Sequence, residues 1–283
     1  MVIRSNMIAA FTNRQLNINE KSKARSTERL SSGYRINRAA DDAAGLSISE
    51  KMRGQIRGLN QASRNAQDGI SLIQTAEGAM NEIHSVLQRM RELTVQASND
   101  TYVTADRLAI AKEVRALTSE VTRIATQTEF NKMKLLSGTF KGKVLQVGAN
   151  TSQLIKFSIA KMTAGSLGVS SVQVAAKLED WATGGATGGG SAITGLISIV
   201  NRAISQVSVQ RSALGALQNR LDHTVANADN MAENLQSSES KIRDANLADE
   251  MVSYSSSSIL QQAGQSMLAQ ANQATQGILS LLG

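Results

Sequence analysis

Apolar and small side chains recur at alternating steps of four and three residues over two long stretches of the chain. The first stretch runs from Ile48 to Ala97 and the second from Ile193 to Leu235. Such steps keep side chains on one helix face, and a face repeated over many heptads is typical of helices that pack side by side. The pattern therefore predicts two long helices. A shorter stretch of the same spacing, Ile110 to Ile124, predicts a third helix that folds back antiparallel on the first.

The spacing changes to a period of two in the middle of the chain. Ile155, Phe157 and Ile159 alternate with polar residues, and a Gly-Ala-Asn-Thr turn at residues 148–151 precedes them. Alternating runs on either side of a turn predict a β-hairpin, which we place at about residues 135–170. The Gly-rich stretch at about 183–192 cannot pack a core and is expected to be an exposed loop. It lacks the Lys-Ser/Thr pair of a phosphate-binding loop.

Weaker seams of four-and-three spacing occupy the two ends of the chain. Their residues are Ile3, Met7, Ala10, Leu260, Ala263, Met267, Ala271, Ala274, Ile278 and Leu281. Because alanine buries little area, these ends are too weakly apolar to fold stably without partners. We therefore expect a terminal coiled-coil domain from residues 1–44 and 242–283 and a helical rod domain at 45–241. The predicted fold class is mainly α: a long antiparallel coiled-coil helix bundle of N- and C-terminal segments with a small β-hairpin region in the middle.

Composition and charge narrow the functional classes. The chain has no Pro, so nothing forces a helix to break, and no Cys, so disulfides and thiolate metal sites are excluded. Of its net charge of +7, much lies in residues 1–60, where eleven Lys and Arg face five Asp and Glu. A basic arm can bind nucleic acid or a membrane surface, but this one holds only Phe11 and Tyr34 for base stacking. No apolar run approaches the roughly 18 residues of a membrane span. We therefore expect neither a nucleic acid nor a membrane as a partner. Any export of the chain would use a signal that is not cleaved.

No arrangement of residues indicates an active site or a metal centre. His84 and His223 stand far apart and outside any metal-ligand spacing. Asp41 and Asp42 beside Gly45 could bind a cation, but the ligand spacing of a calcium loop is absent and helix capping explains them better. Nucleophile and nucleotide motifs are also missing. We therefore expect no enzyme activity, no catalytic or metal-binding residues and no cofactor.

One charged run, Gln88–Leu93, allows two interpretations. Met90 belongs to the seam, whereas Arg89 and Leu93 are neighbours four residues apart on another face. This face could be an ordinary solvated surface, which the pattern alone favours. It could also be a docking point formed by a leucine exposed beside an arginine.

Several segments closely resemble bacterial flagellins. Residues 30–99, with LSSGYRINRAADDAAGLSISEKMRGQ and LQRMRELTVQASN, are similar to the N-terminal region of that family, and TEFNKMKLLSGTF at 128–140 resembles its next landmark. SQVSVQRSALGALQNRLDHT, ESKIRDANLADEM and SMLAQANQATQGILSLL resemble its C-terminal region. The resemblance implies a subunit that polymerises into the flagellar filament for swimming, with paired termini in the inner core. Only residues 163–192 stand where larger flagellins insert outer domains, so it implies a minimal flagellin without outer variable domains.

The resemblance also implies a set of partners. These are further copies in a helical homopolymer, an export chaperone at residues 242–283, and filament cap and hook-junction proteins. It implies type III export to the extracellular filament without signal cleavage. It further implies recognition by Toll-like receptor 5 of hosts through a patch at Arg89, Leu93 and Glu113, which favours docking for the charged run. The nearest alternative is a hook–filament junction protein. An adhesin or nucleic-acid-binding coiled coil that uses the basic arm is an alternative of another class.

Overall fold

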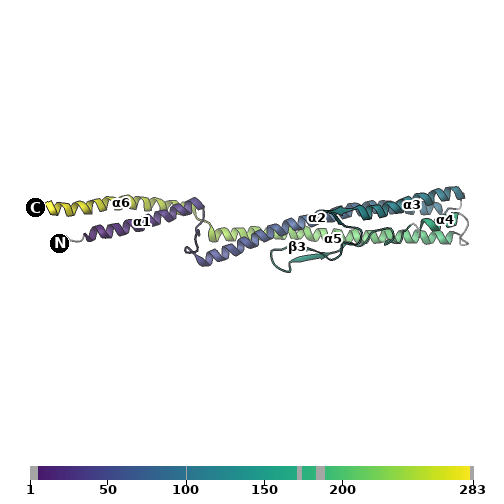
Figure 1. Ribbon diagram of the computed structural model, residues 1–283, viewed down its shortest axis with the longest axis horizontal. Coiled ribbons are helices and arrows are strands. Elements are labelled where there is room, and N and C mark those ends of the chain that lie inside the picture. Colours follow the sequence, from purple (N-terminus) through teal and green to yellow (C-terminus); the bar gives the residue numbers. More distant parts are fainter. Residues whose placement is uncertain (1–5, 100, 171–173, 183–188, 281–283) are drawn as a thin grey trace. The chain divides into compact units, whose positions relative to one another are not determined.

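A computed structural model describes residues 6–99, 101–170, 174–182 and 189–280 (Figure 1). Most of these residues are helical, which confirms the predicted fold class. The helices are α1 (Met7–Ser32), α2 (Ala43–Ala97), α3 (Thr104–Gln127), α4 (Ala175–Ala182), α5 (Gly189–Arg243) and α6 (Leu247–Ser280). None of the described helices is both long enough and apolar enough to cross a membrane.

The chain divides into two compact units. Unit 1 comprises Met1–Ile56 and Ala232–Gly283, and unit 2 comprises Arg57–Met231. The predicted divisions lie instead at 44/45 and 241/242, where α2 has just begun and α5 approaches its end. In the structure both divisions fall well inside the long helices, so α2 and α5 each contribute residues to both units.

The core of unit 2 is formed by the predicted seams of α2, α3 and α5. From Leu59 to Ala97 every seam position of α2 is buried, and Met80, Ile83 and Leu87 are inaccessible to solvent. Val114 and Val121 of α3 and the α5 seam from Leu196 join the same apolar cluster. Apolar side chains at steps of four and three therefore hold the three helices together, because each helix buries one continuous stripe of them.

The buried stripes end before the predicted seams do. Ile48 and Met231 are 46% and 45% exposed, and in each case the next residue, Ser49 or Ala232, is buried instead. A straight helix turns once every 3.6 residues, so its inner face drifts relative to a seven-residue repeat. The seam prediction is therefore wrong at these two positions.

Two β-hairpins cover part of unit 2. Strands β3 (Lys143–Gln146) and β4 (Leu154–Phe157) pair antiparallel with Leu145 opposite Ile155, which confirms the predicted hairpin. Its turn lies directly on α2 at Gly58, where a Cβ atom would lie 2.8 Å from that of Ala149.

The second hairpin was not predicted from the sequence. Strands β1 (Glu129–Phe130) and β2 (Met133–Lys134) are two residues long, and their turn residues Asn131 and Lys132 have φ of 48° and 62°. Positive φ at both central positions matches the twist of a tight hairpin. The available signal was Asn131, because asparagine tolerates this region better than most residues.

The prediction of an exposed Gly-rich loop is wrong for the second half of the stretch. Residues 183–188 lie outside the described residues, but 189–192 form the first turn of α5. Glycine weakens a helix by only about 1 kcal/mol per residue, and burial of the following α5 seam offsets that cost.

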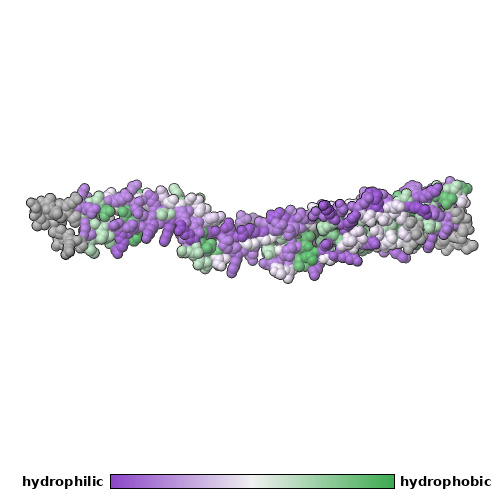
Figure 2. Space-filling model, in the orientation of Figure 1, coloured by the Kyte–Doolittle hydropathy of each residue, from purple (hydrophilic) through white to green (hydrophobic). Residues whose placement is uncertain are grey.

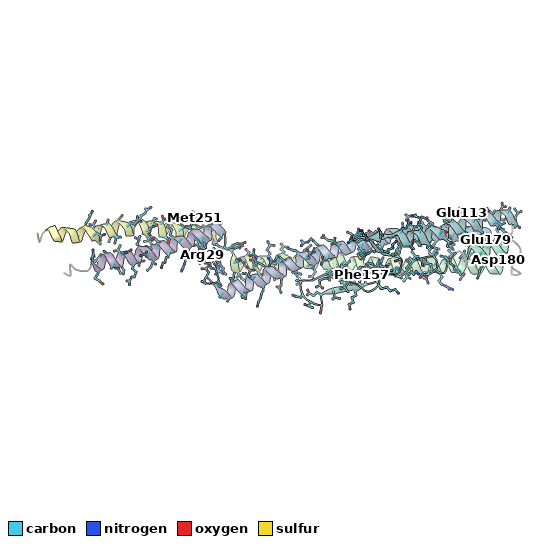
Figure 3. The ribbon with its side chains drawn as sticks, in the orientation of Figure 1. Arg29, Glu113, Phe157, Glu179, Asp180 and Met251 are labelled. Carbon is cyan, nitrogen blue, oxygen red and sulfur yellow. The ribbon has the colours of Figure 1, made fainter. Side chains whose placement is uncertain are left out.

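Helix α4, which precedes the Gly-rich stretch, was not expected from the sequence. It packs on α3, where Arg115 and Glu179 form a 2.6 Å ion pair, and Figure 3 marks Glu179 on α4.

Unit 1 contains an antiparallel helix pair, α1 with α6. Asn6 caps α1 by accepting a hydrogen bond from the Ala9 N–H, and Gly33 ends the helix with a φ of 74° that suits glycine. The backbone then pairs with the residues before α6. The N–H of Arg35 donates to the Arg243 carbonyl at 2.7 Å, and the N–H of Ala245 donates to the Gly33 carbonyl at 2.9 Å.

Candidate functional site

The face that α1 presents to α6 is polar or small along most of its length. Its partly or fully buried positions are Ala9, Thr12, Leu16, Asn19, Lys23, Ser26 and Leu30. The corresponding positions of α6 are Glu250, Tyr254, Ser257, Gln261, Gly264, Leu268 and Ala271. Both sets step by three and four residues, so the heptad geometry is present but large apolar side chains are few.

Side-chain contacts along this α1–α6 seam fix the antiparallel register. Near one end, the Asn6 amide donates to the Ala271 carbonyl at 3.0 Å. In the middle, the Lys23 ammonium donates to Gln261 Oε1 at 3.0 Å. At the other end Arg29 forms a 3.6 Å ion pair with Glu250, next to Met251 in Figure 3. Hydrogen bonds and partly exposed ion pairs contribute little net free energy each, so this seam specifies register more than it stabilises.

The large apolar side chains of α1 and α6 lie on their outer faces instead. The outer face is formed by Met7, Ile8, Phe11 and Ile18 of α1 and by Met251, Val252, Ile259, Leu260 and Met267 of α6. Met7, Val252 and Ile259 are 72%, 70% and 65% exposed. Figure 2 shows hydrophobic patches among hydrophilic surface along this helix pair. Exposed apolar area on this scale is typical of a surface that meets another protein.

The predicted terminal seam therefore divides between these faces. Met7, Ala10, Leu260, Ala263, Met267 and Ala274 are exposed, whereas Ala271 lies in the α1–α6 seam. Ile3 and Leu281 lie outside the described residues, and Ile278 belongs to α6 with a side chain that is also outside them.

A polar junction, which sequence reasoning missed, joins the chain segments at the base of unit 1. Arg243 forms a 2.6 Å ion pair with Glu50 and lies over the ring of Tyr34 at 5.0 Å. Arg53 lies 3.7 Å from both Glu50 and Glu239. Tyr34, the neighbours Glu50 and Arg53, and the neighbours Glu239 and Arg243 come from three separate parts of the sequence, so no local pattern could have indicated that all of them meet.

Two adjacent aspartates order the loop that leads into α2. Asp42 Oδ1 accepts a hydrogen bond from the Gly45 N–H at 2.8 Å, which confirms the predicted capping role. Asp41 Oδ2 accepts from the N–H groups of Arg38 and Asn37 at 2.9 and 3.2 Å. These two backbone hydrogen bonds, with that from Arg38 the stronger cause, lower the pKa of the Asp41 carboxyl.

The candidate receptor patch in unit 2 brings two of its three residues together at the surface. Arg89 of α2 donates to Glu113 of α3 at 3.0 and 3.1 Å, and to Glu92 at 3.2 Å. The hydrogen bond to Glu113, followed by that to Glu92, raises the pKa of the Arg89 guanidinium. A hollow of about 420 Å³ lies beside this cluster, lined by Gln88, Arg91, Glu92, Val95 and Gln96.

The expectation that Leu93 is exposed beside Arg89 is wrong. Its side chain is only 1% exposed and belongs to the core of unit 2. Helix α2 packs against both α3 and α5, so it buries a wider arc than the two heptad positions of a single seam. Any surface at this point is therefore formed by Arg89, Glu92 and Glu113.

Comparison with known proteins covers most of the chain. Residues 3–141 match the family described as bacterial flagellin N-terminal helical region, and residues 197–282 match the bacterial flagellin C-terminal helical region. A flagellin of Halalkalibacterium halodurans is 51% identical over 282 residues, and one of Bacillus subtilis is 47% identical over 303. Both alignments cover 100% of each chain. A solved structure of a putative flagellar hook-associated protein from Vibrio parahaemolyticus has the same fold, with a TM-score of 0.60 at 12% identity over 72% of this chain and 100% of that one.

Proposed function

Because this chain belongs to the bacterial flagellin family, we propose that the outer apolar face of α1 and α6 is the surface through which copies join in the filament. The chain is a subunit of the flagellar filament, a structural protein and not an enzyme, and it is located in the extracellular filament. Full-length relatives at about half identity are flagellins, whereas the likeness to a hook-associated protein extends to the fold alone. This favours the filament subunit over the junction protein.

The exposed outer face carries the assembly proposal. The α1–α6 pair buries polar and small residues against itself and leaves Phe11, Ile259 and Met267 in solvent. Covering such side chains with a neighbouring copy stabilises the polymer by about 1.5 to 3 kcal/mol for each one fully buried. Residues predicted as the terminal assembly seam, Met7 and Leu260 among them, fall on this face.

Seeded polymerisation tests the assembly proposal. Purified wild-type monomer mixed with filament fragments should elongate them. The double variant Ile259→Ser and Met267→Ser should raise the critical concentration at least tenfold, while its monomer unfolds at an unchanged denaturant concentration. The matched control is Gln262→Ser, an exposed polar position of the same helix. Normal elongation by the double variant would contradict the assignment of this face.

Deletion of residues 260–283 provides a coarser version of the same test. The truncated chain should not elongate seeds, because it lacks Leu260 and Met267 of the outer face and the last part of α6. If it elongates them at the wild-type rate, residues 260–283 have no role in assembly.

The same face offers a binding surface for the export chaperone and for the cap and hook-junction proteins. All of these would cover α6 side chains that are otherwise exposed to water. A titration of full-length monomer with the purified chaperone should lose at least tenfold affinity for the Ile259→Ser and Met267→Ser variant, but not for Gln262→Ser. Equal affinity for both would place the chaperone site elsewhere.

Recognition by Toll-like receptor 5 is proposed for the surface at Arg89 and Glu113. The two side chains are about half exposed and form one charged cluster across α2 and α3. Arg89→Ala should weaken signalling in a receptor reporter assay by tenfold or more and leave polymerisation intact. Arg123→Ala is the matched control, because Arg123 is equally exposed and pairs with Glu120 on α3. Unchanged signalling by Arg89→Ala would exclude this residue from the receptor contact.

A further inference from the structure

The hairpin region of unit 2 carries an excess of positive charge that is not part of the proposed assembly face of α1 and α6. Residues 128–162 contain six lysines and one carboxylate, Glu129. The rest of unit 2, residues 57–127 and 163–231, is balanced, with twelve Lys and Arg and twelve Asp and Glu. We call the six exposed lysines, Lys132, Lys134, Lys141, Lys143, Lys156 and Lys161, the lysine ribbon. We propose that the lysine ribbon and the amide-lined hollow beside it bind an acidic polysaccharide.

The backbone of the two hairpins places these lysines on chain segments that run side by side, with Lys143 and Lys156 on opposite faces of the β3–β4 hairpin. The N–H of Met162 donates to the Leu136 carbonyl at 2.9 Å, and that of Ile159 donates to the Phe140 carbonyl at 3.0 Å. Further along, Lys143 pairs with Phe157, which Figure 3 labels, and Val144 pairs with Lys156. Residues 134–144 and 156–162 therefore run side by side.

Among the residues that the structure describes, no carboxylate neutralises the charges of the ribbon. Every ion pair among the described residues uses arginine, and none of the six lysines lies within ion-pair distance of a carboxylate there. Lys134 donates to the Thr126 carbonyl, and Lys143 lies 5.9 Å from the centre of the Phe140 ring. In a second copy, the carboxylates of unit 2 outside the ribbon are balanced in number by cations. Residues 232–250 hold five Asp and Glu against two Lys and Arg, but Glu239 and Glu250 already pair with arginines of the same copy. The electrostatic complement is therefore an external polyanion.

The residue types in the ribbon argue against a nucleic acid. Residues 128–162 contain no arginine, so the ribbon offers separate ammonium groups and no planar fork for paired hydrogen bonds. Their aromatic residues Phe130, Phe140 and Phe157 are buried or half-buried and offer no stacking surface for bases. Separate lysine ammonium groups are suited to charges spaced along a flexible chain, such as carboxylates or sulfates on successive sugar rings.

An uncharged hollow at the hairpin turn adds a site for the sugar ring itself. It has a volume of about 440 Å³, and its polar side chains are Gln61 and Asn65 of α2 and Gln146, Asn150 and Thr151 of the hairpin. Amide and hydroxyl groups of this kind pair with sugar hydroxyls. Gln61 and Asn65 are joined by a 2.9 Å hydrogen bond, and the Asn65 amide donates to the Gln146 carbonyl at 3.2 Å, so the rim is pre-organised.

The hollow is continuous with the ribbon along β4. Gln146 at the rim pairs with Leu154, and Lys156 lies two residues further along the same strand, or about 7 Å. A hexuronic acid ring in the hollow would therefore place the charge of the next ring near Lys156. In a polymer of many copies the site is repeated, which multiplies the strength of attachment to a long polysaccharide.

The test compares three probes on full-length monomer: a heparin oligosaccharide, a 20-base-pair DNA duplex and phosphatidylglycerol vesicles, each at several salt concentrations. The ribbon variant carries Lys141→Gln, Lys143→Gln, Lys156→Gln and Lys161→Gln. Its matched control removes four exposed charges elsewhere, with Lys51→Gln, Lys112→Gln, Lys177→Gln and Arg202→Gln. Wild type should prefer heparin to the other probes, and the ribbon variant should lose at least tenfold affinity for heparin with a shallower salt dependence. The control variant should lose less than threefold.

A second variant, Gln61→Ala with Asn150→Ala, separates the hollow from the charge. It should weaken heparin binding by threefold or more and leave DNA binding and the salt dependence unchanged. The proposal is overturned if both four-charge variants lose affinity equally, since net charge would then explain the binding. It is equally overturned if DNA or vesicles bind through the ribbon more tightly than heparin, or if the hollow variant binds heparin as wild type does. Circular dichroism spectra that match wild type establish that each variant is folded.

Discussion

The two units use the same heptad spacing for opposite purposes. In unit 2, large aliphatic residues such as Ile83 and Leu87 are inaccessible to solvent and hold α2, α3 and α5 together. In unit 1, the face between α1 and α6 consists mainly of polar and small residues, and large ones such as Phe11 and Ile259 face solvent. Unit 2 therefore derives its stability from its own core. Unit 1 is held in register by polar contacts and leaves its apolar area exposed to solvent, where we propose that neighbouring copies bind.

The largest expected effect tests whether stability belongs to unit 2. Leu87→Ala should lower the free energy of unfolding of unit 2 by about 2 to 5 kcal/mol, because it removes fully buried methyl groups and leaves a cavity. Leu16→Ala on the half-buried α1–α6 seam should cost less than half as much. Urea denaturation of the monomer measures both values. Equal losses would contradict the contrast between the two units.

A substitution in the α1–α6 seam should make unit 1 more like unit 2. Asn19 is half-buried among polar neighbours, and Asn19→Leu should stabilise the helix pair by about 1 kcal/mol through burial of apolar area. Slower amide hydrogen exchange in α1 and α6 of the monomer would report this gain. The control is Asn13→Leu, an exposed position of the same helix that should not slow exchange. Faster exchange in the Asn19→Leu variant would mean that the polar seam is already optimal.

A smaller effect concerns the loop before α2, which polar contacts hold in place. Asp42→Ala removes the cap of α2 and should cost about 1 kcal/mol, measured by urea denaturation. The matched control is Ser47→Ala, an exposed position within the first turns of the same helix. A cost at Ser47 equal to that at Asp42 would argue against a specific capping role.

The smallest effect is a dependence on pH at Asp41. Its pKa is lowered in the folded state, so its contribution to stability is complete above about pH 4, the ordinary aspartate pKa, and is lost as the pH falls through the lower folded value. The wild-type loop should therefore loosen below about pH 4, seen as lower protection of the Asn37 and Arg38 amides relative to their intrinsic exchange rates at each pH. In Asp41→Asn the protection of these amides should already be lower at neutral pH and should vary less with acid. Identical pH profiles for both proteins would exclude Asp41 as the cause.

The core of unit 2 could be predicted from the sequence because large side chains mark its buried face directly. The seam positions of α2 between Leu59 and Ala97 are spaced in heptads, and the burial of their side chains follows from that spacing. The hairpin of β3 and β4 could be predicted equally well, because Ile155 and Phe157 alternate with polar residues shortly after a turn. Leu93 was misplaced because a heptad pattern assumes one partner helix, whereas α2 contacts two.

The surfaces of unit 1 were harder to predict for a physical reason. A search for apolar seams finds the side chains that face solvent here, such as Met267, and overlooks buried polar ones such as Ser257 and Gln261. The junction of Arg243 with Glu50 and Tyr34 depends on residues that approach only in the folded chain. The lysine ribbon could have been seen as a charge cluster, but its alignment required the register of the two hairpins.

The hydrogen bond between Asn6 and Ala271 joins residues 265 positions apart in the chain. Closing a loop of that length in a disordered chain costs about 5 kcal/mol of conformational entropy. The polar contacts of the α1–α6 seam alone contribute less favourable free energy than that. Contacts between α2 and α5 shorten the remaining loops, so the helix pair of unit 1 is expected to fold after unit 2. Pulse-labelled hydrogen exchange should find α1 and α6 protected last. A ribosome must have released residue 271 before the pair can close, and until then α1 stays available to be threaded or bound by another protein.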